Sequence, residues 1–409
     1  MARYAKKIST GDATTEHLSC GVLALCFPMA DIQAILAECR CLAQRTRDLP
    51  PQVMVFFVIA LSLFPEVGYQ GVLRWLVNGL RWLGNAGASP SAKSSLAAAR
   101  WRLGAAPLRR LHEQLARPLT EPRLRGTYWK GHHLVALDGS TLALQDTAAN
   151  AEAYGRPSNQ GGEGAWPLAR FVALAEVGPH LVFQAALGSY QDSEITLSRQ
   201  ILGALAPGML CLADRLFPGF GFWKEAAARG CALLWRAKSG LALSPVKALE
   251  DGSWLADWHP SKKDRARAGE APQRVRVIEY RLHDPGAADT GEVYRLLTTI
   301  LNPGQGRAEE LAALYPQRWE IELSIKETKS ILRKGRVTLR SNLRELVEQE
   351  FWGMLLAHYA VRKMMAQAAL ETGADPDELS YQGGIEIIKT EIAGPALPFP
   401  PADMSAAAG

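Results

Sequence analysis

The stretch YPQRWEIELSIKETK, residues 315–329, decides how this chain folds and what it does. Four of its side chains are polar and chemically active: Tyr315, Arg318, Glu322 and Lys329. On a helix with about 100° of rotation per residue, these side chains project within an arc of about 60°. The sequence therefore predicts one helix face that gathers a phenol, a guanidinium, a carboxylate and an ammonium group.

The residues around this polar strip predict its surroundings. Apolar residues flank it on both sides: Ile321, Ile325 and Leu332, then Trp319 and Leu323. The opposite face is polar and is expected to be solvated: Glu320, Ser324 and Glu327. Charged groups aligned between apolar residues indicate a site. The alternative is an internal ion pair between Arg318 and Glu322, which are four residues apart on an ordinary helix.

Two aspartates, each at the end of an apolar run, favour a site. Asp138 ends the run in HLVALDGS, which predicts a buried strand with a turn after Gly139, and Asp214 ends the run in MLCLADRLF. A carboxylate at the end of a buried strand is costly unless it has a function. With Glu322, these residues supply the oxygen ligands of a two-metal phosphodiester site, in which the ions lie about 4 Å apart.

The three motifs resemble those of the DDE transposases of the insertion sequence 4 type. That family's spacing of Tyr, two residues, Arg, three residues, Glu, six residues and Lys is matched without a gap between residues 315 and 329. Its first Asp lies in a D-G-S/T context, as Asp138 does, and its second in an apolar-A-D-R-x-F context, as Asp214 does. The resemblance extends through RTRDLPPQVMVFFVIALSLF and SLAAARWRLG and covers most of residues 15–370.

The resemblance implies a cut-and-paste DNA transposase. Asp138, Asp214 and Glu322 are then expected to hold two Mg²⁺ ions, for which Mn²⁺ can substitute. The implied reactions are cleavage at the transposon ends, with a hairpin intermediate, and strand transfer into target DNA. The implied partners are double-stranded DNA and a second copy of the chain, because two ends must be processed together. Arg318 and Lys329 are expected to hold DNA phosphates, Arg318 bidentately, and Tyr315 to donate a hydrogen bond to one.

Composition bounds the class of protein. The 409 residues are 48% hydrophobic and 21% charged, with a net charge of +5, which is typical of a globular protein that is compatible with nucleic acid. The six cysteines form no CxxC pair and are expected to be thiols in a reducing cytosol. The longest apolar run, residues 53–64, is too short to span a bilayer, and the N-terminal residues lack the apolar core of a signal peptide.

The order of elements predicts an α/β fold: a ribonuclease-H-like mixed sheet with a β-rich insertion, preceded by an all-α N-terminal domain. The expected boundaries are residues 1–126 for the helical domain, 127–237 and 301–370 for the catalytic core, 238–300 for the insertion and 371–409 for the tail. In the helical domain, Arg100, Arg102, Arg109 and Arg110 either face DNA phosphates or form a solvated helix face.

Two features of the insertion are candidate DNA contacts. Lys262, Lys263 and Arg265 form a basic cluster that can hold the DNA backbone by charge, although a solvated loop explains it nearly as well. Tyr294 begins the last expected strand of the insertion. In relatives an aromatic residue here stacks on a base displaced from the DNA end, but a strand tyrosine is more often a packing residue.

Two other functions remain open. A structure-selective nuclease or resolvase on the same core would cut DNA without strand transfer. A DNA-binding relic would bind the ends without catalysis, although the intact acidic triad argues against it.

Overall fold

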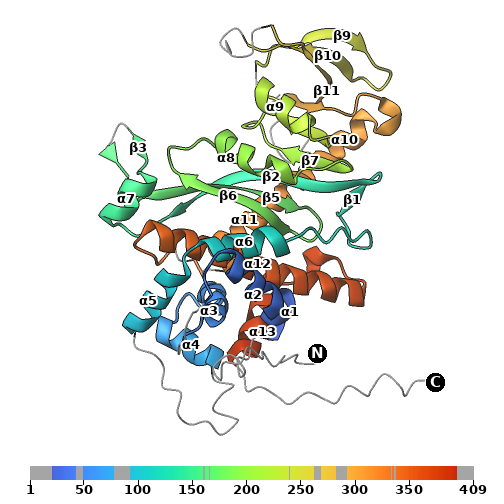
Figure 1. Cartoon of the computed structure of the whole chain (residues 1–409). Coiled ribbons are helices and arrows are strands. Elements are labelled where there is room, and N and C mark those ends of the chain that lie inside the picture. The colour runs from blue at the N-terminus through green and yellow to red at the C-terminus, as the bar shows by residue number, and fades with distance from the viewer. Residues whose placement is uncertain are drawn as a thin grey trace, which may run out of the picture.

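The computed structural model describes residues 21–42, 49–77, 93–159, 162–164, 166–238, 240–261, 269–281, 293–332, 334–335 and 338–393. Ten strands of these residues form one large sheet, with the order β6-β5-β2-β7-β8-β12-β11-β10-β9 and with β1 paired to β2 (Figure 1). Their bounds are β1 Tyr128–Trp129, β2 His132–Ala143, β5 Leu168–Glu176, β6 Leu181–Ser189, β7 Met209–Ala213, β8 Ala232–Arg236, β9 Ser244–Ala248, β10 Trp254–Trp258, β11 Gln273–Arg281 and β12 Val293–Thr298. A second, two-stranded sheet joins β3 (Ser158–Asn159) to β4 (Gly162–Glu163).

Strand β2 is the centre of the catalytic half of this sheet. It pairs with β5 in antiparallel fashion along nine residue pairs, and with β7 in parallel fashion from His133 to Leu137. The expected turn after Gly139 is wrong, because Gly139 pairs with Val172 and the strand continues to Ala143. The antiparallel ladder with β5 supplies the backbone hydrogen bonds that keep residues 139–143 extended. The mixed sheet, with parallel and antiparallel pairs side by side, confirms the predicted fold class.

Helices cover the sheet on both sides. On one side lie α8 (Glu194–Ile201) and α9 (Phe220–Ala227), and on the other side lie α11 (Trp319–Lys326) and the long helix α12 (Arg344–Thr372) (Figure 1). Below α12 lie most of the N-terminal helices and α13 (Tyr381–Ala393), whereas the last N-terminal helix, α6, lies beside α12 and also contacts β6 (Figure 1). The N-terminal helices are α1 Gly21–Cys26, α2 Met29–Glu38, α3 Pro51–Leu63, α4 Tyr69–Val77, α5 Lys93–Leu103 and α6 Ala106–Leu115. A short helix, α7 (Ala148–Tyr154), follows β2, and α10 (Ala308–Leu314) precedes residues 315–329.

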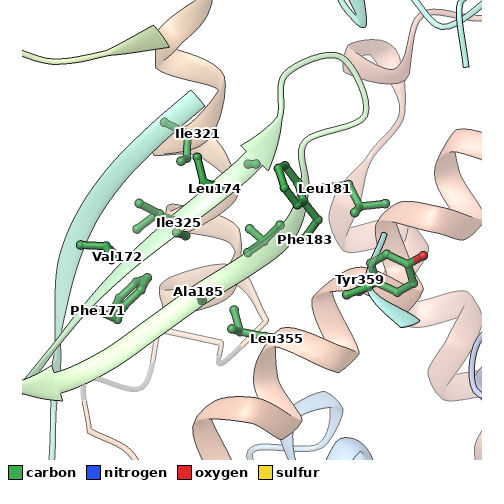
Figure 2. Packing of buried hydrophobic residues seen from close by; sticks show 14 of the residues in the cluster. Phe171, Val172, Leu174, Leu181, Phe183, Ala185, Ile321, Ile325, Leu355 and Tyr359 are labelled. Carbon is green, nitrogen blue, oxygen red and sulfur yellow. The ribbon is translucent and has the colours of Figure 1, made fainter. Parts of the chain in front are cut away.

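One continuous hydrophobic core joins these layers. Side chains of β5 and β6, including Leu174 and Phe183, gather with Ile321 and Ile325 of α11 and with Leu355 of α12 (Figure 2). Ile321 is 1% exposed and Ile325 is 8% exposed. The apolar side of the 315–329 segment, as predicted at these two positions, therefore fixes α11 on the sheet by burying hydrophobic surface.

The insertion extends the same sheet. Strand β12 pairs with β8 in antiparallel fashion, and β11, β10 and β9 follow it outward. Three of these strands were expected from the sequence, and β9 was not. All five residues of β9 are exposed, so the alternation of apolar and polar residues that reveals a half-buried strand is missing there.

The arginines of the helical domain have mixed environments. Arg100 is 1% exposed and donates hydrogen bonds to Gln349 and Ser341, so it fits neither alternative, a contact with DNA phosphates or a solvated helix face. Arg109 and Arg110 form exposed ion pairs with acidic residues of the same domain. Among the described helices, none combines the length and the apolar character needed to cross a membrane.

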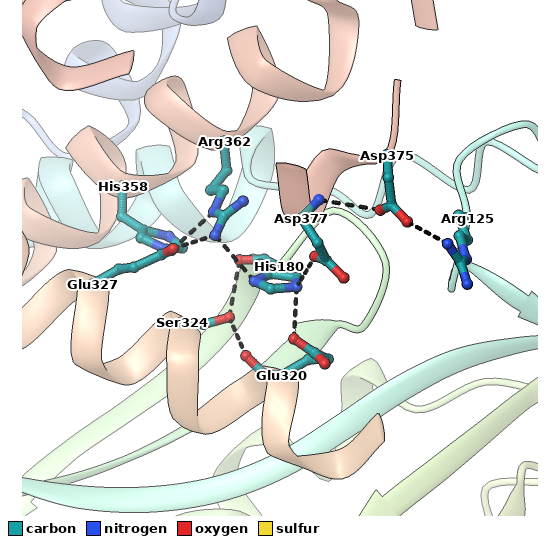
Figure 3. A network of polar contacts seen from close by, with 9 residues as sticks. All are labelled: Arg125, His180, Glu320, Ser324, Glu327, His358, Arg362, Asp375 and Asp377. Carbon is teal, nitrogen blue, oxygen red and sulfur yellow. Dashed lines mark hydrogen bonds and ion pairs between the residues drawn. The ribbon is translucent and has the colours of Figure 1, made fainter. Parts of the chain in front are cut away.

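The side chains that are buried and exposed on the back of the 315–329 segment differ from those that the sequence predicted. Ser324 and Glu327 are buried, whereas Trp319 and Leu323, expected to be apolar flanks, are 57% and 44% exposed. Glu327 is buried because it is paired: Arg362 Nε donates to Glu327 Oε2 at 2.8 Å, and His358 Nε2 lies 3.2 Å from the same oxygen (Figure 3). Burial opposes ionisation of Glu327, but the hydrogen bonds and the charge of Arg362 lower its pKa below the ordinary value.

Arg362→Met should be strongly destabilising, because it leaves the Glu327 carboxylate buried without its cation. Breaking such a pair costs about 3–5 kcal/mol. We expect the free energy of unfolding, measured by urea denaturation, to fall by about that amount. Lys326→Met removes an exposed cation one residue away from Glu327. This substitution should change the free energy of unfolding by less than about 0.5 kcal/mol. Equal effects of the two substitutions would contradict the buried pair.

Candidate active site

The two aspartates lie side by side because of the register between β2 and β7. The last residue pair of this parallel ladder is Leu137 with Ala213. Asp138 and Asp214 are each one residue beyond that pair, at the point where β7 stops and β2 continues. Each carboxylate accepts a local backbone hydrogen bond: Asp138 Oδ1 from Gly139 N at 2.8 Å, and Asp214 Oδ1 from Leu216 N at 2.7 Å.

Arg318 brings Glu322 to these aspartates. Its Nη2 lies 2.8 Å from Glu322 Oε1, and its Nη1 lies 3.8 Å from Asp138 Oδ2. Arg318 is buried, whereas the side chain of Glu322 is 37% exposed. The internal ion pair that was the alternative interpretation therefore exists, and the same guanidinium also reaches the strand. A buried cation between two carboxylates reduces their repulsion and holds them close together.

The charges of Asp214 and Glu322 both act on Asp138. The pKa of Asp138 is raised to about 7, chiefly by burial and also by these two charges, while the Gly139 hydrogen bond and the charge of Arg318 oppose the rise. A carboxylate crowded by like charges in a poorly solvated place is stabilised by a cation. The donor set, three carboxylates from two strands and a helix, fits a divalent metal, which prefers oxygen ligands.

The other two residues of the motif contact the same strands. Lys329 Nζ donates to Ser140 Oγ at 2.8 Å, which places this ammonium group beside the D-G-S motif. Lys329 lies in a π-helical turn, Glu327–Ile331, that follows α11. Tyr315 begins a 3₁₀ turn, Tyr315–Arg318, between α10 and α11, with Pro316 directly after it. Its hydroxyl donates to the Ala213 carbonyl at 3.3 Å, and the side chain is buried, so burial raises its pKa.

The candidate DNA contacts of the insertion are Tyr294 and a basic cluster that falls outside the described residues. Tyr294, in β12, stacks on Tyr280 with ring centroids 5.5 Å apart, and Arg236 lies 4.1 Å from its ring centroid. No contact of Tyr294 with the three carboxylates is recorded among the described residues. Lys262, Lys263 and Arg265 fall outside the described residues.

A fourth carboxylate at the site was missed from the sequence. Glu194 begins α8, and its Cδ would lie 2.7 Å from a Cβ at position 139, so Gly139 leaves room for this side chain. Burial raises the pKa of Glu194, opposed by Arg170 at 3.8 Å and reinforced by the charge of Asp214. The glycine of the D-G-S motif was the available signal, because glycine in a strand often marks a close approach.

Comparison with known proteins assigns the family. The transposase DDE domain family matches residues 129–359, and the insertion element 4 transposase N-terminal family matches residues 17–113. The chain belongs to the DDE transposases of the insertion sequence 4 type. It is similar to the transposase InsG for insertion sequence element IS4 of Escherichia coli strain K12, with 29% identity over 86% of this chain and 78% of that protein. It is also similar to the putative transposase InsZ of the same strain, with 29% identity over 47% of this chain and 62% of that protein.

Among solved structures, this transposase is similar to the piggyBac transposase synaptic complex with hairpin DNA. The TM-score is 0.42 and the identity is 8%, over 93% of this chain and 81% of that one. Family membership makes the chain a DNA transposase, an enzyme that binds DNA, and implies the use of a divalent metal.

Asp138→Asn should stabilise the metal-free transposase at alkaline pH only. The unfolded chain loses the Asp138 proton near pH 3.8 and the folded chain near pH 7, so stability falls as the pH rises between these values. Asparagine removes this cost. With EDTA present, we expect the free energy of unfolding at pH 8 to rise by about 2–4 kcal/mol. At pH 4 the gain should vanish, and a gain of equal size there would contradict the raised pKa. Asp146→Asn, at an exposed position, is the control.

Proposed function

We propose that this transposase cuts its own element's ends with two Mg²⁺ ions held by Asp138, Asp214 and Glu322. When bound, the ions activate the attacking hydroxyl and stabilise the leaving 3′ oxygen. The observation that carries the proposal is the contact of Arg318 with both Glu322 and Asp138, which joins the helix to the strand at the carboxylates. We also propose that cleavage passes through a hairpin on the transposon end and that two copies of the chain act together on two ends.

The cations of the 315–329 segment have separate roles in this proposal. Arg318 keeps the carboxylates together before the metal binds and then offers its guanidinium to the scissile phosphate. A planar guanidinium suits bidentate contact with phosphate oxygens. Lys329, beside Ser140, acts as a point charge for a neighbouring phosphate. Tyr315 supports the end of β7 through the Ala213 carbonyl, and a phosphate contact by Tyr315 requires that its hydroxyl leave this acceptor.

The DNA contacts of the insertion remain part of the proposal. Tyr294 is half-buried, and its ring lies between Tyr280 and the Arg236 guanidinium. Stacking of an unpaired base on this ring requires that Arg236 or Tyr280 move away from it, and such stacking contributes about 1–3 kcal/mol per base. Lys262, Lys263 and Arg265 are proposed to contact the DNA backbone.

Glu322→Gln should separate catalysis from binding. The substitution keeps the side-chain shape but removes a proposed metal ligand, so we expect Mg²⁺-dependent cleavage of DNA that carries the element's terminal repeats to fall by about 10³-fold or more. End binding, measured by gel shift, should be retained. Glu371→Gln, at an exposed position of α12, is the control and should cut normally. Wild-type cleavage by Glu322→Gln would overturn the assignment.

The products of the same assay decide between the alternatives. A denaturing gel should resolve a hairpin on the transposon end, and a purified end with a 3′ hydroxyl should join to plasmid DNA. Cleavage without joining would favour the structure-selective nuclease, and binding without cleavage would favour the inactive relic. Linear products without hairpins would remove the hairpin step but not the transposase reaction.

Glu194→Gln should weaken the use of metal without abolishing cleavage. We propose that this carboxylate supports the site from the α8 side, through Asp214, and loss of a supporting group at a metal site typically costs about 10–100-fold. We expect a higher Mg²⁺ concentration for half-maximal cleavage. Gly139→Ala, which would displace Glu194, should shift the Mg²⁺ dependence in the same direction. Glu152→Gln, an exposed glutamate of α7, is the control, and a Mg²⁺ dependence unchanged in Glu194→Gln would exclude the role.

A further inference from the structure

Helix α5 of the helical domain has one side that the rest of the domain leaves uncovered. Ser95, Ala98, Trp101 and Arg102 are all exposed, and Trp101 is 56% exposed. At about 100° per residue, these four side chains project within an arc of about 120°, with Ala98 near its middle. The opposite side of α5 packs against α3, α4 and α12. We call the four exposed residues the outer face of α5.

Arg100 fixes which side of α5 points outward. It is 1% exposed, and its guanidinium donates hydrogen bonds to Gln349 Oε1 at 2.7 Å, Tyr69 Oη at 2.5 Å and Ser341 Oγ at 3.3 Å. Gln349 Nε2 in turn donates to the Arg100 carbonyl at 2.9 Å. A buried network with all these contacts made holds the helix in one rotation. The outer face is therefore already formed in the free chain.

The outer face has a shape and a charge that suit DNA. Ser95 and Ala98 are small, so another surface can approach the helix backbone closely. The guanidinium of Arg102 has no hydrogen bond or ion pair among the described residues, whereas Arg109 and Arg110 are paired with glutamates. Helices α4 and α5 contain no Asp or Glu. A helix about 10–12 Å wide fits the major groove of B-DNA, which is about 12 Å wide.

A second copy of the chain suits this face less well. In a two-fold contact the face would meet itself, so two Arg102 guanidinium groups would oppose each other without an acidic partner. DNA carries negative charge along its whole length, and this transposase binds DNA. Charge complementarity therefore favours DNA as the occupant.

The segment 338–341 connects α5 to the strand that carries Asp138. Strand β2 continues from Asp138 to Ala143, about 17 Å of extended chain, and the Ala143 carbonyl accepts a hydrogen bond from Leu339 N at 2.9 Å. Ser341, two residues later, is the residue that Arg100 contacts. Helix α5 lies on the side of the molecule toward which β2 runs (Figure 1). These connections place α5 on the order of one turn of B-DNA, about 34 Å, from the carboxylates.

Buried hydrogen bonds hold this segment from two further sides. Glu350 of α12 accepts from Ser341 Oγ at 2.7 Å and from Ser341 N at 3.0 Å. The Arg340 guanidinium donates to the carbonyls of Leu61 and Phe64, at the end of α3, at 2.6 Å and 2.8 Å. Loss of buried hydrogen bonds is costly, so the segment resists bending. The distance between the outer face of α5 and Asp138 is consequently fixed.

We propose that the outer face of α5 contacts the double-stranded DNA of the transposon end about one helical turn inside the cleaved phosphate. Trp101 makes apolar contact with sugars and base edges, and Arg102 holds a phosphate. The segment 338–341 sets the spacing between this contact and the cut. The inference rests on the proposed function for the position of the cut at Asp138, and it goes beyond that function because α5 carries none of the reacting groups.

Binding of the full chain to an end duplex tests the outer face without cleavage. With EDTA present, fluorescence anisotropy measures the affinity for a labelled duplex that carries the element's terminal repeat. We expect Trp101→Ala and Arg102→Ala each to weaken binding by about 10-fold, and Arg102→Ala to lower the slope of affinity against salt by about 1. Ala98→Gln adds bulk without charge at the middle of the face and should weaken binding to a similar extent.

Two matched substitutions serve as controls. Leu25→Ala truncates a side chain that is 50% exposed in α1, on the opposite side of the helical domain (Figure 1). Arg117→Ala removes an exposed positive charge of the same domain. Both should change the affinity by less than about 2-fold. Melting temperatures close to that of the wild type are expected for all these variants, because every substituted side chain is exposed.

Hydroxyl-radical footprinting locates the contact on the DNA. The wild-type chain should protect the backbone near the cleaved phosphate and again about 10 base pairs further inside. Trp101→Ala should lose the internal protection alone. Glu322→Gln should keep both protections, so wild-type cleavage by Glu322→Gln would remove the active-site assignment without changing this readout.

Three results would overturn the proposal. The first is unchanged affinity in both Trp101→Ala and Arg102→Ala. The second is equal loss of affinity in these variants and in the two controls, which would indicate only diffuse attraction between the domain and DNA. The third is a shift of Trp101→Ala from dimer to monomer in sedimentation without DNA, together with unchanged affinity, which would assign the outer face to a second copy of the chain.

Discussion

The structure depends on holding three like charges together at the edge where β7 ends. Arg318 does this from the helix side: its guanidinium contacts Glu322 and lies 3.8 Å from Asp138. The raised pKa of Asp138 shows that repulsion and poor solvation are only partly relieved. Such a site gains from binding a metal, because the charge that Arg318 leaves uncompensated favours a cation. The helix and the strands must therefore be spaced so that Arg318 reaches both Glu322 and Asp138.

The 315–329 segment meets that constraint because it is held on two sides. Ile321 and Ile325 bury hydrophobic surface against the sheet, while Glu327 and Ser324 make buried polar contacts with α12 and the β5–β6 turn. Hydrophobic contact alone permits sliding and rotation, since it has little directionality. The buried ion pairs and hydrogen bonds have defined geometry, so they fix the rotation of the helix. Glu322 consequently projects toward Asp138 rather than toward solvent.

The sequence predicted the components of the site better than the surfaces around it. The spacing of the motif predicted Arg318, Glu322 and Lys329 as site residues, and the apolar runs located Asp138 on a strand and Asp214 just after one. The faces of α11 were harder to predict, because Glu327 and Ser324 are polar residues whose burial depends on partners such as Arg362, which are distant in sequence. Trp319 and Leu323 are exposed for the converse reason, since no described element covers them. The uninterrupted β2 was missed because its continuation beyond Gly139 depends on pairing with β5.

The pairing of β8 with β12 has a consequence for how such enzymes diversify. Leu234 and Trp235, where the chain leaves the core, lie opposite Thr298 and Leu297, where it returns. The chain leaves the core and returns to it at residues that pair with each other. The length and sequence of the segment between them therefore do not determine where α11 lies. Evolution can remodel that segment without displacing the helix that carries Glu322.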